Sequence, residues 1–196
     1  VTVTIGTGGT STEGTDYTDG SGSLNDITIS ANSTTGTVSF TPTDDSVYEG
    51  NETATIAING VSGKSGVAEH GTPQTVTITI TENESAPTVS LSTGSTSVYD
   101  NGSNITLTAT STQEADEDIT VTISTTGTGT EGTDYGTISD ITISAGDTTG
   151  TASFTPTDDS VYEGNETGIV AIDGVSGADA AESGAQSVTI TITEND

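Results

Sequence analysis

The sequence contains no cysteine, methionine or tryptophan, and its one basic side chain, Lys64, stands against 29 acidic residues. Without cysteine there is no disulfide framework, no thiolate metal site and no cysteine nucleophile. The formal net charge of −28 excludes an electrostatic partnership with nucleic acid or with an anionic membrane surface. No apolar run is long enough to span a membrane. Because the chain does not begin with methionine, we expect it to be a segment of a longer protein.

Apolar residues are also scarce, at 28% of the chain with 4% aromatic, a composition that by itself favours disorder. Their arrangement indicates order, because valine and isoleucine alternate with threonine in runs such as 76–80 and 188–192. β-branched residues with a period of two are typical of half-buried strands. No segment shows a helical period, so the sequence predicts an all-β protein.

An internal repeat organises the chain, since Thr41–Thr53 recurs without change at Thr155–Thr167. The repeating unit is roughly 110 residues, the usual size of an immunoglobulin-like antiparallel β-sandwich. The second copy is expected to have strands at 88–92 with a continuation at 97–99, then 104–111, 119–124, 140–144, 149–155, 167–172 and 186–193. The first copy is expected to have strands at 1–5, 26–30, 35–41, 53–58 and 75–81.

Residues 88–118 have no counterpart before Val1, so the first copy lacks the opening strands. The predicted organisation is a partial sandwich at 1–84 followed by a complete sandwich at 85–196.

Each copy of the repeated stretch carries four carboxylates with no lysine or arginine close in sequence. They are Asp44, Asp45, Glu49 and Glu52 in the first copy, and Asp158, Asp159, Glu163 and Glu166 in the second. Carboxylates packed this densely repel one another, and protonation or a bound cation relieves the repulsion. Oxygen ligands on a loop suit a hard cation, and calcium in particular.

Other acids are expected at the same end of the sandwich. In a seven-stranded antiparallel order, the first, third and fifth turns meet at one pole, together with the end of the last strand. Asp100, Asp134, Glu194 and Asp196 fall at these places, so we predict that they join the calcium site.

Two other features of the loops carry expectations of their own. Tyr48 and Tyr162 are expected to pack as corner residues that hold the acidic turn against the sandwich. At the opposite pole, the acids Glu114 and 116–118 form either a charged loop or part of an ion site between copies.

Three segments of the second copy, 132–135, 158–166 and 188–196, resemble the Calx-β domain, and the first copy repeats them at 14–17, 44–52 and 76–84. Such domains occur in sodium–calcium exchangers and, in tandem, in large bacterial surface and adhesin proteins. The resemblance implies Ca²⁺ bound at the pole that holds the end of the last strand. It adds to the predicted ligands Asp16, Glu82 and Glu84.

The sequence departs from the family pattern in two places. Glu82–Glu84 and Glu194–Asp196 stand where the family has a run of aspartates, and Asp100 has no counterpart in the first copy.

No nucleophile–base pair can be assembled, because His70 is the only histidine, and we expect no enzymatic activity. The sequence favours a calcium-rigidified stalk or fibre segment of a secreted or cell-surface bacterial protein, with neighbouring repeats or identical subunits as partners. Two alternatives remain: a fibre subunit completed by strand exchange with a neighbour, and an adhesive module that binds a glycan or ice.

Overall fold

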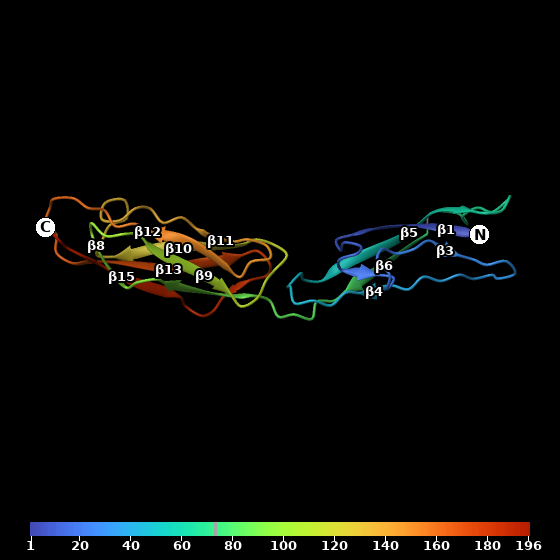
Figure 1. Ribbon diagram of the computed structural model, residues 1–196, viewed down its shortest axis with the longest axis horizontal. Helices are drawn as coiled ribbons and strands as arrows, with labels where there is room; N and C mark the ends of the chain where they lie inside the picture. Colours follow the sequence, from blue (N-terminus) through green and yellow to red (C-terminus); the bar gives the residue numbers. More distant parts are fainter. Residues whose placement is uncertain (73) are drawn as a thin grey trace. The chain divides into compact units, whose positions relative to one another are not determined.

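The computed structural model describes residues 1–72 and 74–196, and in these ranges every regular element is a strand (Figure 1). The chain divides into two compact units. The first comprises Val1–Asp45 and Gly50–Asn83, and the second comprises Ser46–Glu49 and Glu84–Asp196. The predicted all-β class with tandem sandwiches is confirmed. Among the described residues there is no helix of the length and apolarity that a membrane span needs.

The second unit is built from two sheets. One sheet has the order β11-β10-β13-β15-β8 and the other has the order β12-β9-β7-β14. The strands of the first sheet are β8 (Ser97–Tyr99), β10 (Ile119–Gly127), β11 (Ile141–Ile143), β13 (Glu166–Ser176) and β15 (Ser187–Thr193). Those of the second sheet are β7 (Thr88–Thr93), β9 (Ile105–Ser111), β12 (Thr149–Phe154) and β14 (Ala181–Glu182).

The alternation of apolar residues and threonine determines which side chains form the core. Along β9, Ile105, Leu107 and Ala109 are buried, while two of the threonines between and beside them are exposed. The fully buried ring of Phe154 stacks on Tyr135 with ring centroids 4.6 Å apart. Each such fully buried large side chain contributes about 1.5–3 kcal/mol. The core therefore orders the strand ends from which the acidic loops start.

Strand pairing departs from the all-antiparallel expectation at two edges. β8 pairs in parallel with β15, and β14 pairs in parallel with β7. Each edge strand is only two or three residues long, so a short local crossover places it beside a strand of the same direction. The β8–β15 pair lies next to the C-terminus (Figure 1).

A β-bulge interrupts the pairing of β10 with β13. Thr122 faces Gly174 and Ile123 faces Ile172, so Asp173 is the extra residue. The N–H of Ile123 donates to Asp140 Oδ1 at 2.9 Å. Asp140 directly precedes β11, which pairs with β10 on the side away from β13, so its carboxylate continues the β10–β11 pairing beyond the end of β11. In the first unit Asp26 accepts from the N–H of Ile5 in the same way, at 3.1 Å.

The first unit has a four-stranded sheet of order β3-β1-β5-β6 and a separate β2–β4 pair. The strands are β1 (Thr2–Gly9), β2 (Tyr17–Thr18), β3 (Ile27–Thr28), β4 (Thr41–Pro42), β5 (Glu52–Ser62) and β6 (Thr75–Ile80).

The strand expected at 35–41 is wrong, because only Thr41 belongs to a strand. Its counterpart β12 pairs with β9 alone, and no segment within residues 1–72 and 74–84 corresponds to β9. A strand with no ladder partner leaves its backbone groups unpaired. Phe40 consequently stays partly exposed, although it stacks on Tyr17 with centroids 4.7 Å apart.

Candidate metal centre

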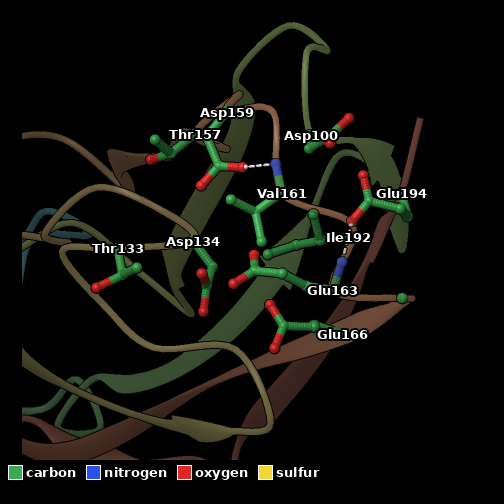
Figure 2. A pocket seen from close by; sticks show the side chains of 11 residues that line it. Asp100, Thr133, Asp134, Thr157, Asp159, Val161, Glu163, Glu166, Ile192 and Glu194 are labelled. Atoms are coloured by element: carbon green, nitrogen blue, oxygen red, sulfur yellow. Dashed lines mark hydrogen bonds between the residues drawn. The ribbon is translucent and has the colours of Figure 1, made fainter. Parts of the chain in front are cut away.

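A small cavity at one pole of the second unit gathers the acidic loops (Figure 2). Its volume is about 20 Å³, enough for one water-sized occupant. The carboxylates that line it are Asp100, Asp134, Asp159, Glu163, Glu166 and Glu194. These six residues come from sequence positions up to 94 residues apart (Asp100 to Glu194), so the sandwich topology assembles the site.

Asp134 is fixed by the loop that follows β10. The N–H of Thr130 donates to Asp134 Oδ2 at 2.6 Å, and the Asp134 carbonyl accepts from the N–H of Thr157 at 3.0 Å. Within this loop Gly132 has φ +85, a backbone conformation that glycine adopts without steric cost. Asp134 is 8% exposed, so its carboxylate is held in place before any ligand arrives.

The repeated acidic stretch forms the opposite wall of the cavity. Asp159 Oδ1 accepts from the N–H of Val161 at 2.7 Å, which makes a local Asx turn. The N–H of Glu163 donates to Glu194 Oε2 at 2.9 Å, so the loop is tied to the end of β15 (Figure 2). In Figure 2 the side chains of Asp134, Glu163 and Glu166 point toward one another.

Asp100 reaches the pole because β8 runs parallel to β15. Its N–H donates to the carbonyl of Thr193 at 3.2 Å. The side-chain amide of Asn195 donates to Asp100 Oδ1, and also to Asp158 Oδ1 at 3.4 Å. Sequence reasoning did not include Asn195 among the site residues. The available signal was its position between Glu194 and Asp196, because a side-chain amide has two N–H donors and can bridge two carboxylates.

Two groups of carboxylates in the second unit have the spacing of a cation site. Asp134, Glu163 and Glu166 form one group, and Asp100, Glu194 and Asp196 form the other. In each group, one oxygen per residue lies within 4.8 Å of the others. Two oxygens bound to the same calcium at 2.3–2.6 Å are at most about 5 Å apart. The observed spacing therefore fits oxygens that share one calcium ion.

Burial and mutual repulsion raise the pKa values of two carboxylates of the site, and a bound cation would relieve this repulsion. Desolvation, followed by the charges of Asp134, Asp159 and Glu194, raises the pKa of Glu163. The pKa of Glu166 is raised by desolvation and then by Asp134, Glu163 and Glu194.

The second group shows the same pattern. Desolvation, Glu194 and Asp100 raise the pKa of Asp196. In contrast, the hydrogen bond from the Asn195 side chain lowers the pKa of Asp100. The donated hydrogen bond therefore acts on Asp100 in the direction opposite to the desolvation and like charges that act on Asp196.

The first copy repeats part of this arrangement. Asp16 and Glu52 of the first unit stand where Asp134 and Glu166 stand in the second copy. Asp16 is 7% exposed, and its Oδ2 accepts from the N–H of Thr12, as Asp134 accepts from Thr130. Glu82 Oε2 accepts from the N–H of Gly50 at 2.7 Å, the counterpart of the Glu194 bond to the acidic stretch.

Comparison with known proteins identifies the family of this arrangement. The Calx-beta domain matches residues 1–84 and again residues 82–196. The chain belongs to the Calx-beta domain family. No curated protein sequence matches it.

Two solved structures are similar to the chain. The crystal structure of the apo form of the Calx CBD1 domain is 18% identical, with a TM-score of 0.47, and the match covers 56% of this chain and 99% of that one. The crystal structure of CBD12 from CALX1.2 is 14% identical, with a TM-score of 0.42, and the match covers 97% of this chain and 86% of that one.

Not every predicted ligand of the Calx-beta copies lies in a carboxylate group. Asp159 lines the cavity but belongs to no group of three, and Asp158 accepts only from Asn195 at the rim. Asp44 accepts from the side chain of Asn83 at 2.9 Å. The predicted ligands of the second copy that lie outside its two groups are therefore Asp158 and Asp159.

The expectation for the two tyrosines of the acidic stretch is wrong. Tyr162 is 74% exposed and holds no turn against its sandwich. Tyr48 is buried at 9% exposure, but it packs against the β9–β10 turn of the second unit. The rings that do pack beside the site are Tyr17 and Tyr135, which are fully buried.

Proposed function

We propose that each Calx-beta copy binds calcium at its acidic pole, and that the chain is a calcium-rigidified structural segment of a secreted or cell-surface protein. The observation that carries this proposal is the pair of carboxylate groups in the second unit. Each group draws its oxygens from separate loops and strand ends. The only lysine of the sequence, Lys64, lines a different cavity with Val1 and Ile29 of the first unit, and the second unit contains no lysine or arginine of its own.

Each residue of the site has a separable role. Asp134, Glu163 and Glu166 would hold one ion, and Asp100 with Glu194 would hold another. Calcium bound there supplies the positive charge that cancels the mutual repulsion and joins the loops to the end of β15. The backbone N–H of Thr130 and the amide of Asn195 orient the carboxylates in advance, which reduces the entropy lost on binding.

Binding to the folded state alone stabilises it by mass action. At a free calcium concentration 100 times the Kd, each ion adds about 2.7 kcal/mol. Extracellular modules bind calcium in the range of about 10⁻⁴–10⁻³ M, and the chain carries 29 acidic residues against one lysine. A structural role in a calcium-rich medium is consistent with both facts.

Thermal unfolding with calcium and with a chelator tests the proposal, and calorimetric titration counts the ions. Calcium should raise the unfolding temperature of the parent chain, and Asp134→Asn should remove the part of that rise that comes from the ion held with Glu163 and Glu166. The matched control is Asp173→Asn. This exposed residue lies outside the cavity, and the first copy has Asn59 at the same place. Equal unfolding temperatures of the parent in the two buffers would refute calcium binding.

A second candidate function, fibre assembly by strand addition, is favoured by the first unit. Residues 35–40 form no strand, and Val76 on the edge strand β6 is 60% exposed. Strands donated by a neighbouring chain in the places of β9 and β8 would cover them. Light scattering coupled to size-exclusion chromatography distinguishes the candidates, because strand addition gives concentration-dependent assemblies whereas a stalk segment stays monodisperse.

A further inference from the structure

The tetrapeptide Ser-Val-Tyr-Glu occurs in both copies of the acidic stretch, in two different settings. Ser46–Glu49 belongs to the second unit, and its Tyr48 is 9% exposed. The identical Ser160–Glu163 has Val161 at 58% and Tyr162 at 74% exposure. Since the sequences are the same, the difference arises from what covers each tetrapeptide.

Tyr48 is held by both its backbone and its side chain. Its N–H donates to the carbonyl of Glu114 at 3.0 Å, and its carbonyl accepts from the N–H of Asp116 at 3.1 Å. These bonds form a parallel β-bridge with Ala115. The phenol donates to Asp179 Oδ2 at 2.9 Å, and the ring joins the hydrophobic core of the second unit. A tyrosine held in this way has its apolar ring buried and its hydroxyl satisfied.

The surface that receives Tyr48, hereafter the receiving surface, consists of residues 114–116 and 177–179. Ala178 and Asp179 both have φ +50, a conformation that is strained for residues other than glycine. Such strain persists only where surrounding contacts compensate for it. Ala178 packs in the same core cluster as Tyr48, and Asp179 accepts its phenol. The receiving surface is therefore shaped around a tyrosine.

We propose that Ser160–Glu163 is a docking segment that places Tyr162 on the receiving surface of a further Calx-beta sandwich of the same sequence type. The sandwich that receives Tyr162 must offer a turn like 114–116 and a hydrogen-bond acceptor like Asp179. The first unit offers no such acceptor, because it has Ser65 in place of Asp179. The receiving surface of the second unit is already filled by Tyr48. The partner is thus a complete sandwich with an empty receiving surface, and this docking does not depend on the proposed calcium function.

The test extends the full chain with an additional copy of residues 85–196 placed directly after Asp196. This junction reproduces the natural spacing, because Glu194–Asp196 stands where Glu82–Glu84 precedes Ser85. The appended copy carries Tyr162→Phe, so that nitration of this sequence reports on the original Tyr162 alone. Tetranitromethane labelling followed by mass spectrometry measures the reactivity of each tyrosine in calcium and in chelator.

In the parent chain Tyr162 should react as fast as the exposed Tyr99, and Tyr48 should be protected. In the extended chain Tyr162 should become as protected as Tyr48. Replacing Asp179 by asparagine in the appended copy alone should restore part of the reactivity. Continued protection of the buried Tyr135 shows that every chain tested is folded.

A second measurement uses the unfolding temperature. Tyr48→Ala should lower it in the parent chain, whereas Tyr162→Ala should lower it only in the extended chain. The proposal is overturned if Tyr162 of the extended chain stays as reactive as Tyr99 in both buffers. It is also overturned if Tyr162→Ala has the same effect on both chains. Loss of the calcium response with retained protection of Tyr162 would contradict the proposed function and leave the docking intact.

Discussion

Replacing Glu166 by glutamine should stabilise the calcium-free protein and destabilise the calcium-bound protein. The change keeps the shape of the side chain and removes one charge from the group with Asp134 and Glu163. At separations of up to 4.8 Å, each pair of like charges repels by about 1 kcal/mol in a water-like dielectric and by 3–4 kcal/mol at an effective dielectric constant of about 20.

The lower value applies here, because Glu163 is exposed and solvent screens its charge. In chelator, Glu166→Gln should therefore gain about 1 kcal/mol, or about 4 °C in unfolding temperature for a domain of this size. At a calcium concentration 100 times the Kd, the loss of a ligand removes most of the 2.7 kcal/mol that the ion contributes. Because the removed repulsion offsets part of this loss, the net result in calcium is a loss of about 1.5 kcal/mol relative to the parent.

Differential scanning calorimetry of the parent, Glu166→Gln and the control Asp173→Asn, each in calcium and in chelator, measures these effects. The opposite signs in the two buffers are the decisive result, since a merely structural glutamate would lower stability in both. A variant that is destabilised in chelator, or one that keeps the full calcium response, would refute the electrostatic reasoning.

Two further predictions concern pH and the core. The raised pKa values of Glu163 and Glu166 mean that the folded state holds these protons more tightly. In chelator, stability should therefore rise as the pH falls from 7 toward the ordinary carboxyl value of 4.5, and calcium should flatten this rise. Below pH 3.8 the lowered pKa of Asp100 opposes this rise, because protonating Asp100 costs stability. Melting curves recorded between pH 7 and pH 3 measure both effects. Phe154→Ala should cost about 3–5 kcal/mol in denaturant unfolding, and Phe40→Ala clearly less, because only Phe154 is fully buried; equal losses would contradict this.

Much of the fold follows from local pattern. Alternation of β-branched residues with threonine located β9, β10 and β13, because a half-buried strand requires that pattern. Turn order then predicted that Asp100, Asp134 and Glu194 converge, and the structure brings their carboxylates to one cavity. These inferences needed only the period of the strands and the order of the turns.

What could not be predicted depends on partners distant in sequence. Residues 35–40 have a strand pattern but no partner to pair with, and pairing is not visible in a local pattern. Tyr48 and Tyr162 have identical neighbours in sequence and opposite burial, so no local rule could separate them. The bridging role of Asn195 depends on the distance between two loops, which sequence spacing does not give.

The parallel pairing of β8 with β15 has a consequence for a chain under tension. Thr191, Ile192 and Thr193 face Ser97, Val98 and Tyr99, and a pull between residues 88 and 196 draws these strands past each other along their length. Interstrand hydrogen bonds lie across such a pull, so they must break together rather than one after another. Asp100 and Glu194 follow directly at the ends of the two strands, where a shared ion would resist the first sliding step. The calcium concentration of the medium would then set the force at which a Calx-beta copy unfolds.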